Sequence, residues 1–127
     1  MALEDEIMNL IREVLESYRD LKTGKKELDA EISRQNSRYP KNPPVIVLST
    51  HVIELLRRYQ SGELSESRIL EWVNTVWFSG WFEYADNQSD SIASVMNELE
   101  ELDEEGKVLT KEMVEKYIGA LEKNAEV

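Results

Sequence analysis

The sequence predicts an all-α protein, a single-domain helical bundle of about five helices around an aromatic-rich central helix. Three observations support this fold class. Apolar residues recur at helical spacing along most of the 127 residues. Serine, threonine and glycine stand where these stretches would begin and end. The run VIVL at 45–48 suits a short strand, but we find no second run of this kind to pair with it.

The stretch 64–86 is the expected centre of the bundle. It holds the three tryptophans of the chain, Trp72, Trp77 and Trp81. Its polar residues fall on one narrow stripe, which consists of Arg68, Glu71, Thr75, Ser79 and Glu83. A helix that is apolar around most of its girth is normally covered by neighbours on several sides. Ser65 is expected to cap its first amides, and Gly80 to mark a kink or a close helix–helix approach.

Residues 1–32 form one long helix or a helical hairpin in this prediction. Their apolar seam follows a spacing of four and three and consists of Leu3, Ile7, Ile11, Val14, Tyr18, Leu21, Leu28 and Ile32. Thr23 and Gly24 interrupt the stretch, but the register continues across them and favours a continuous helix. Such a helix would either cover the central one or pair with a second copy as a coiled coil.

Residues 33–44 are predicted to be a linker, because their three prolines exclude helix. The core of the bundle is expected over residues 45–122. Its first helix is placed at 45–60 and is ended by Gly62 in the left-handed conformation. The only histidine, His51, is assigned a structural or exposed role.

Two further helices complete the predicted core. One is expected over 91–103, after a turn in which Ser89 or Asp90 caps it. The last begins after Thr110, which is expected to cap it. Its predicted inward residues are Val114, Tyr117, Ile118 and Leu121. Residues 123–127 are predicted to fray.

The net charge of −11 is concentrated in the second half of the chain, where residues 63–97 carry −5 and residues 98–127 carry −6. Such a charge argues against direct binding of nucleic acid or anionic lipid, and it suits a basic protein partner. No apolar run reaches the roughly 18 residues that indicate a transmembrane helix. The N-terminus lacks the basic-then-apolar pattern of a signal peptide. We therefore expect a cytoplasmic protein that does not bind membranes.

The sequence offers little for catalysis. It has no cysteine, one histidine and only scattered glycines, which argues against nucleophilic catalysis, a di-iron site and a phosphate-binding loop. Glu98 with Glu101, and Glu112 with Glu115, repeat the spacing that holds Mg²⁺ in all-α pyrophosphohydrolases. Acid-rich helices produce this spacing by chance, and no lysine–asparagine set for phosphate accompanies it. We expect no enzymatic activity, no cofactor and no metal site.

The segment 59–121 carries two short motifs, Tyr-x-Ser-Gly-x-Leu-Ser from residue 59 and Leu-Asp-Glu-x-Gly from residue 102. With the aromatic helix and the short acidic helix between them, this segment resembles small helical immunity proteins of the colicin D and contact-dependent growth inhibition type. The resemblance implies a bacterial cytoplasmic protein that binds a cognate nuclease toxin and blocks its active site. The acidic surface would occupy the basic cleft in place of nucleic acid.

The residues expected to face such a toxin are acids of the segment 98–105 and aromatic residues at their rim. They are Glu98, Glu101, Asp103, Glu104 and Glu105, with Tyr84 and Phe82 as aromatic anchors. Two alternatives stay open. The acids could be a solvated surface, and the protein could be a structural or adaptor protein that forms a homodimer through Leu3–Ile32.

Overall fold

A computed structural model describes residues 2–34 and 45–127 of the chain, with the side chains of 11–33 and 45–127. Six α-helices account for most of the described residues, which confirms the all-α prediction with one helix more than expected. They are α1 (Ala2–Arg19), α2 (Lys25–Arg34), α3 (Ser49–Gln60), α4 (Glu66–Phe78), α5 (Ser89–Glu100) and α6 (Lys111–Glu122). Two short 3-10 helices, η1 (Asp86–Gln88) and η2 (Glu101–Asp103), flank α5, and β1 (Val45–Val47) pairs with β2 (Phe82–Tyr84). Ser33 and Arg34, which were predicted to begin the linker, instead end α2, and residues 35–44 of the predicted linker lie outside the described residues.

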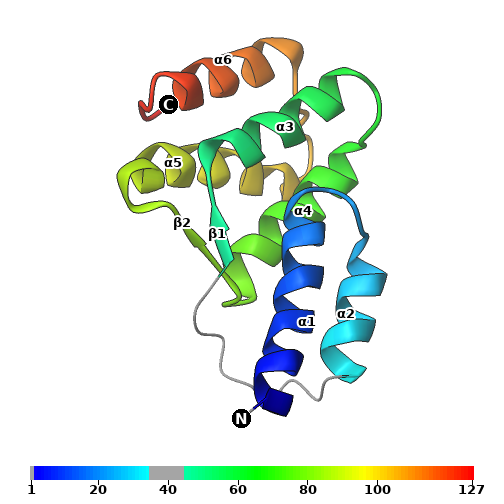
Figure 1. The fold of residues 1–127 in the computed structure, drawn as a ribbon. Coiled ribbons are helices and arrows are strands. Elements are labelled where there is room, and N and C mark those ends of the chain that lie inside the picture. Colours follow the sequence, from blue (N-terminus) through cyan, green and yellow to red (C-terminus); the bar gives the residue numbers. More distant parts are fainter. Residues whose placement is uncertain (1, 35–44) are drawn as a thin grey trace.

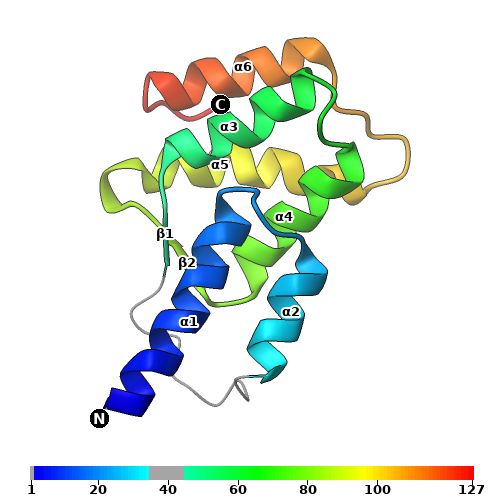
Figure 2. The same cartoon turned by 45° about the vertical axis from the view of Figure 1, so that its right-hand side comes forward.

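The helices form two groups that α4 connects. Helices α3, α5 and α6 pack together at one end, while α1 and α2 form a hairpin at the other (Figures 1 and 2). The two strands lie beside α1, between the hairpin and the N-terminal ends of α3 and α5 (Figure 1). One continuous core of buried apolar side chains joins these parts.

The N-terminal segment is a hairpin, and the continuous helix that its register favours is wrong. Helix α1 ends at Arg19, and Leu21 adopts a φ of 65°. A leucine in the left-handed region cannot continue a helix, so the chain turns there. The apolar register continues across the turn because Leu21 and Leu28, on its two sides, pack into the same core.

The helix predicted from residue 45 is wrong for its first residues, which form β1. The N–H of Val45 donates to the Trp81 carbonyl at 2.9 Å, and the N–H of Ala85 donates to the Val47 carbonyl at 3.0 Å. The two strands run parallel, with Val47 opposite Tyr84. Val45 and Val47 are both buried. The short apolar run is therefore a strand whose partner was not recognised in the sequence.

The partner strand lies inside the stretch that was predicted to continue the central helix. Helix α4 ends at Phe78, and Gly80 adopts a φ of 79°. Glycine occupies the left-handed region at no steric cost, so it turns the chain into β2. Gly80 thus lies after the end of the helix and not at a kink within it. The capping prediction is confirmed, since the Ser65 hydroxyl accepts a hydrogen bond from the Arg68 N–H at 3.1 Å.

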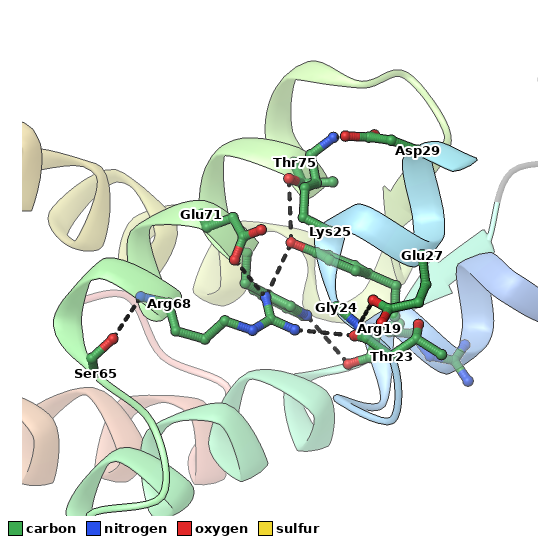
Figure 3. Close-up of polar contacts among 12 residues, drawn as sticks. Arg19, Thr23, Gly24, Lys25, Glu27, Asp29, Ser65, Arg68, Glu71 and Thr75 are labelled. Carbon is green, nitrogen blue, oxygen red and sulfur yellow. Dashed lines mark hydrogen bonds and ion pairs between the residues drawn. The ribbon is translucent and has the colours of Figure 1, made fainter. Parts of the chain in front are cut away.

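Two residues of the polar stripe on α4 bind the hairpin. The Tyr18 hydroxyl donates to the Thr75 hydroxyl at 3.3 Å, and the Arg68 guanidinium donates to the Tyr18 hydroxyl and the Thr23 carbonyl, each at 3.2 Å (Figure 3). The guanidinium also lies over the Tyr18 ring, 4.9 Å from its centroid, and pairs with Glu71 at 3.2 Å. Arg68 and Thr75 therefore hold the hairpin against α4, whereas Ser79 and Glu83 of the predicted stripe lie beyond the end of the helix.

Most of the helix boundaries in the second half match the prediction. Gly62 adopts a φ of 85°, and the Thr110 hydroxyl accepts from the Met113 N–H at 3.2 Å. The four inward residues predicted on α6 are all buried. The cap of α5 was wrong, because Gln88 occupies that position and its side chain instead accepts from the Ser49 N–H at 3.0 Å.

His51 lies in the first turn of α3 and its side chain caps the N-terminus of this helix, in agreement with a structural role. Its Nδ1 accepts a hydrogen bond from the Leu48 N–H at 2.8 Å, and its Nε2 lies 3.4 Å from the Asp20 carboxylate. Burial, and then the positive charge of Arg19, lower the pKa of His51 below its usual 6.5, while Asp20 acts in the opposite direction. Protonation of Nδ1 would also remove the acceptor of the cap.

We expect the free energy of unfolding to fall as the pH drops below about 6.5. Below this pH the unfolded chain binds a proton at His51 more readily than the folded chain does, because the fold lowers the pKa of this histidine. The stability that neutral His51 contributes is therefore complete above about pH 6.5 and is lost as the pH falls toward the folded-state pKa. Urea unfolding between pH 7.5 and 5 measures this loss. In His51→Asn, which retains a side-chain acceptor, the slope over this range should disappear. An unchanged slope would show that His51 does not cause it.

The C-terminal tail does not fray as predicted. Asn124 donates from its side-chain amide to the Asn87 carbonyl at 2.8 Å and accepts from the Ser91 hydroxyl at 2.8 Å. The N–H of Val127 donates to the Ser94 hydroxyl at 3.1 Å. The tail therefore holds the start of α5 in place.

Replacing Asn124 by glycine should lower the free energy of unfolding by about 1–3 kcal/mol, because two side-chain hydrogen bonds are lost. Glycine tolerates the φ of 53° at this position, so backbone strain does not add to the loss. Thermal unfolding followed by circular dichroism measures the effect. Lys123→Ala, a change at the exposed neighbouring residue, is the control and should be nearly neutral.

Candidate partner-binding surface

A groove of about 640 Å³ lies between the C-terminal half of α4 and the end of α5 with η2. Its described lining residues are Asn74, Phe78, Asn97, Glu100, Glu101, Asp103 and Glu104. Four carboxylates, two amides and one aromatic ring thus share one concave surface, and none of these lining residues is basic. We call this surface the acidic groove.

The end of α5 explains why carboxylates gather in the acidic groove. The apolar stripe of α5, which consists of Ile92, Val95, Met96 and Leu99, is buried, so its polar residues lie on the outer side. The chain then tightens into η2, and the Glu104 N–H donates to the Glu101 carbonyl at 2.9 Å. This turn brings Glu101, Asp103 and Glu104 into the same groove as Phe78.

The predicted acids separate into two sets in the structure. Glu101, Asp103 and Glu104 line the acidic groove, together with Glu100, which was not among the selected residues. Glu98 and Glu105 are not among its lining residues. Burial, and then the negative charges of Glu98 and Glu101, raise the pKa of the Tyr117 hydroxyl on α6.

Glu105 is exposed on the loop after η2. It therefore stands beside the acidic groove and not in its wall.

The predicted aromatic anchors are more buried than expected. Phe82 is half-buried and packs against the core. Tyr84 is also half-buried, and among the described residues its hydroxyl has no hydrogen-bond partner. Burial, and then the charge of Glu100, raise the pKa of Tyr84. Neither side chain lines the acidic groove.

Among the described residues, the exposed aromatic side chains are those of Trp77 and Phe78, which were predicted to lie in a covered helix. Phe78 is 65% exposed and Trp77 is 40% exposed. The Trp77 ring lies 6.3 Å from that of Phe78 and 6.1 Å from that of Tyr84, measured between centroids. These three rings, which we call the aromatic ridge, connect the acidic groove to β2.

A partner cation suits the chemistry of this surface. A guanidinium or ammonium group can bind a carboxylate through charge-assisted hydrogen bonds and also stack on an aromatic face. Exposed aromatic side chains are enriched at the centres of protein interfaces, where they supply much of the binding energy. The acidic groove and the aromatic ridge offer both kinds of contact side by side.

The described residues contain no group of three or more histidine, aspartate or glutamate side chains that could hold a metal ion. Glu112 and Glu115, the second predicted pair of acids, are exposed on α6. Within the described ranges, moreover, no helix has the length and apolar character needed to cross a membrane.

Comparison with known proteins adds no relative. No family model matches the chain, and neither the curated proteins nor the solved structures contain a match. The function is therefore inferred from the surface itself.

Proposed function

We propose that this protein is an acidic binding protein of the cytoplasm, an immunity protein that binds and neutralises a cognate basic nuclease toxin. The observation that supports the proposal is the acidic groove, which four carboxylates line together with an exposed phenylalanine. A nuclease active site is positively charged because it must hold phosphate groups. A surface with this charge can bind the cationic side chains that line such a site.

The acids and the aromatic residues have different roles in this proposal. Glu101, Asp103 and Glu104 attract the basic cleft and take the positions of phosphates, which makes association fast and sensitive to salt. Phe78 and Trp77 bury apolar area against the rim of the cleft and slow dissociation. Inhibition follows because nucleic acid and the acidic groove compete for the same cationic side chains.

The alternative, an adaptor that dimerises through Leu3–Ile32, has less support. Ile11, Tyr18 and Leu28 of the proposed seam are buried within the chain itself. Residues that already pack in the core of one copy are not available to a second copy. The side chains of residues 1–10 lie outside the described part.

A pull-down from lysate of the source organism tests the proposed function. Tagged protein is used at low and at high salt, and the captured protein is assayed for nuclease activity with and without the bait. We expect one basic nuclease domain at a ratio near one to one, loosened by salt and inhibited by the bait. Recovery of the protein itself alone, with a solution mass of a dimer, would contradict the proposal and favour the adaptor.

A further inference from the structure

Strand β2 has one edge that no described strand covers. The Trp81 carbonyl and the Ala85 N–H bond to β1. Backbone groups of alternate residues in a strand point to opposite edges, so Phe82 and Tyr84 direct their N–H and C=O groups away from β1. The outer edge of β1 differs, because Arg19 of α1 donates to the Ile46 carbonyl at 2.9 Å.

The free edge of β2 borders a second, smaller groove. This groove has a volume of about 280 Å³ and is lined by Val76, Trp77, Phe82, Glu83 and Tyr84. Trp77 of the aromatic ridge thus stands beside the edge with 40% of its surface exposed. An open strand edge next to an apolar pocket is the arrangement by which proteins bind extended peptides.

We propose that the outer edge of β2 binds an extended segment of a basic partner protein as a third strand. Backbone hydrogen bonds to Phe82 and Tyr84 would hold the segment. Its side chains would alternate, with apolar residues beside Trp77 and basic residues beside Glu83, which is exposed between the two half-buried residues of β2. The choice of a basic partner rests on the proposed function, whereas the strand addition rests on the geometry of β2.

Charge favours a basic segment over a second copy of the chain at the edge of β2. Two copies paired through β2 in an antiparallel way would bring their Glu83 side chains together, and like charges opposite each other destabilise a strand pair. Each copy also carries a net charge of −11. A basic segment turns the same charges into attraction.

The test is a titration of the ¹⁵N-labelled full chain with a capped peptide of alternating sequence, Lys-Val-Arg-Val-Lys, followed by amide chemical shifts. We expect the largest downfield shifts at Phe82 and Tyr84. The same peptide with its backbone amides methylated keeps charge and side chains but cannot donate to the edge. It should bind at least about tenfold more weakly, as expected for the loss of two hydrogen bonds.

A variant pair controls for the pocket. Trp77→Ala should weaken binding of the alternating peptide several-fold, whereas Val108→Ala, at a residue that is 61% exposed outside both grooves, should not.

Three results would overturn the inference. They are equal affinity of the methylated peptide, no shift at Phe82 and Tyr84 at millimolar peptide, and a dimer that forms through β2 without peptide. Shifts confined to residues 100–104 would refute strand addition while leaving the acidic groove as a binding surface. A failed pull-down with positive peptide shifts would refute the proposed function alone.

Discussion

Replacing Trp72 by alanine is expected to lower the free energy of unfolding by about 3–5 kcal/mol. The indole is 0% exposed in the middle of α4, so its removal leaves a large cavity. Its ring N–H also donates to the Arg19 carbonyl at 3.3 Å, which ties α4 to the hairpin. A domain of this size has a total stability of roughly 5–15 kcal/mol, so the variant should be close to unfolding at room temperature. Urea unfolding followed by circular dichroism measures the change.

Trp77→Ala is the matched control on the same helix. Because Trp77 is 40% exposed, its replacement should cost clearly less than that of Trp72, about 1–2 kcal/mol. The same substitution of the same residue type, five positions along one helix, thus distinguishes the buried face from the exposed face. Similar losses for both variants would contradict the orientation of α4 in the fold.

Three helix boundaries could be predicted from the sequence because each depends on a few neighbouring residues. Ser65 and Thr110 cap helices with their own hydroxyls, and Gly62 ends one with a positive φ. These features are local, so the sequence pattern is sufficient. The buried stripes of α5 and α6 could be predicted for the same reason, because the apolar residues of each stripe recur at helical spacing within one helix.

The strands could not be predicted because their evidence lies far apart in the chain. Three residues of β1 pair with three residues of β2, 37 positions later, and neither run stabilises a strand alone. The sequence 82–84 also continues the aromatic pattern of α4, and Gly80 is a weak local sign that the helix has ended. Tertiary pairing therefore determines a structure that local propensity does not.

The acids of the candidate site could be predicted only in part, because their convergence depends on the tertiary structure. Three of the five selected acids line the acidic groove, because the acid-rich segment itself is visible in the sequence. Which of them converge depends on the phase of α5 and on the η2 turn. The exposed aromatic residues were missed, although the helical period of the buried Ile69, Trp72, Val73 and Val76 puts Phe78 on the opposite face of α4 and Trp77 at the edge of the buried face. An aromatic run was interpreted as core because aromatic residues are mostly buried.

Reversing three charges of the acidic groove should weaken binding of the basic partner at least about tenfold, because each attraction becomes a repulsion. The variant is Glu101→Lys, Asp103→Lys and Glu104→Lys, and the measurement is the dissociation constant by calorimetry with the captured nuclease. The fold should be retained, since all three side chains are exposed and no ion pair involving them is found among the described residues. Most of the loss should vanish at high salt, where wild-type binding is itself weak.

The control carries the same change in net charge at another place. Glu112→Lys, Glu115→Lys and Glu126→Lys alter exposed acids of α6 and the tail that do not line the acidic groove. If only the overall charge steers the partner, both triple variants should slow association equally. A local docking surface predicts a much larger loss for the groove variant, with faster dissociation as well as slower association. Equal losses would therefore refute the acidic groove as the binding site, even if the partner is confirmed.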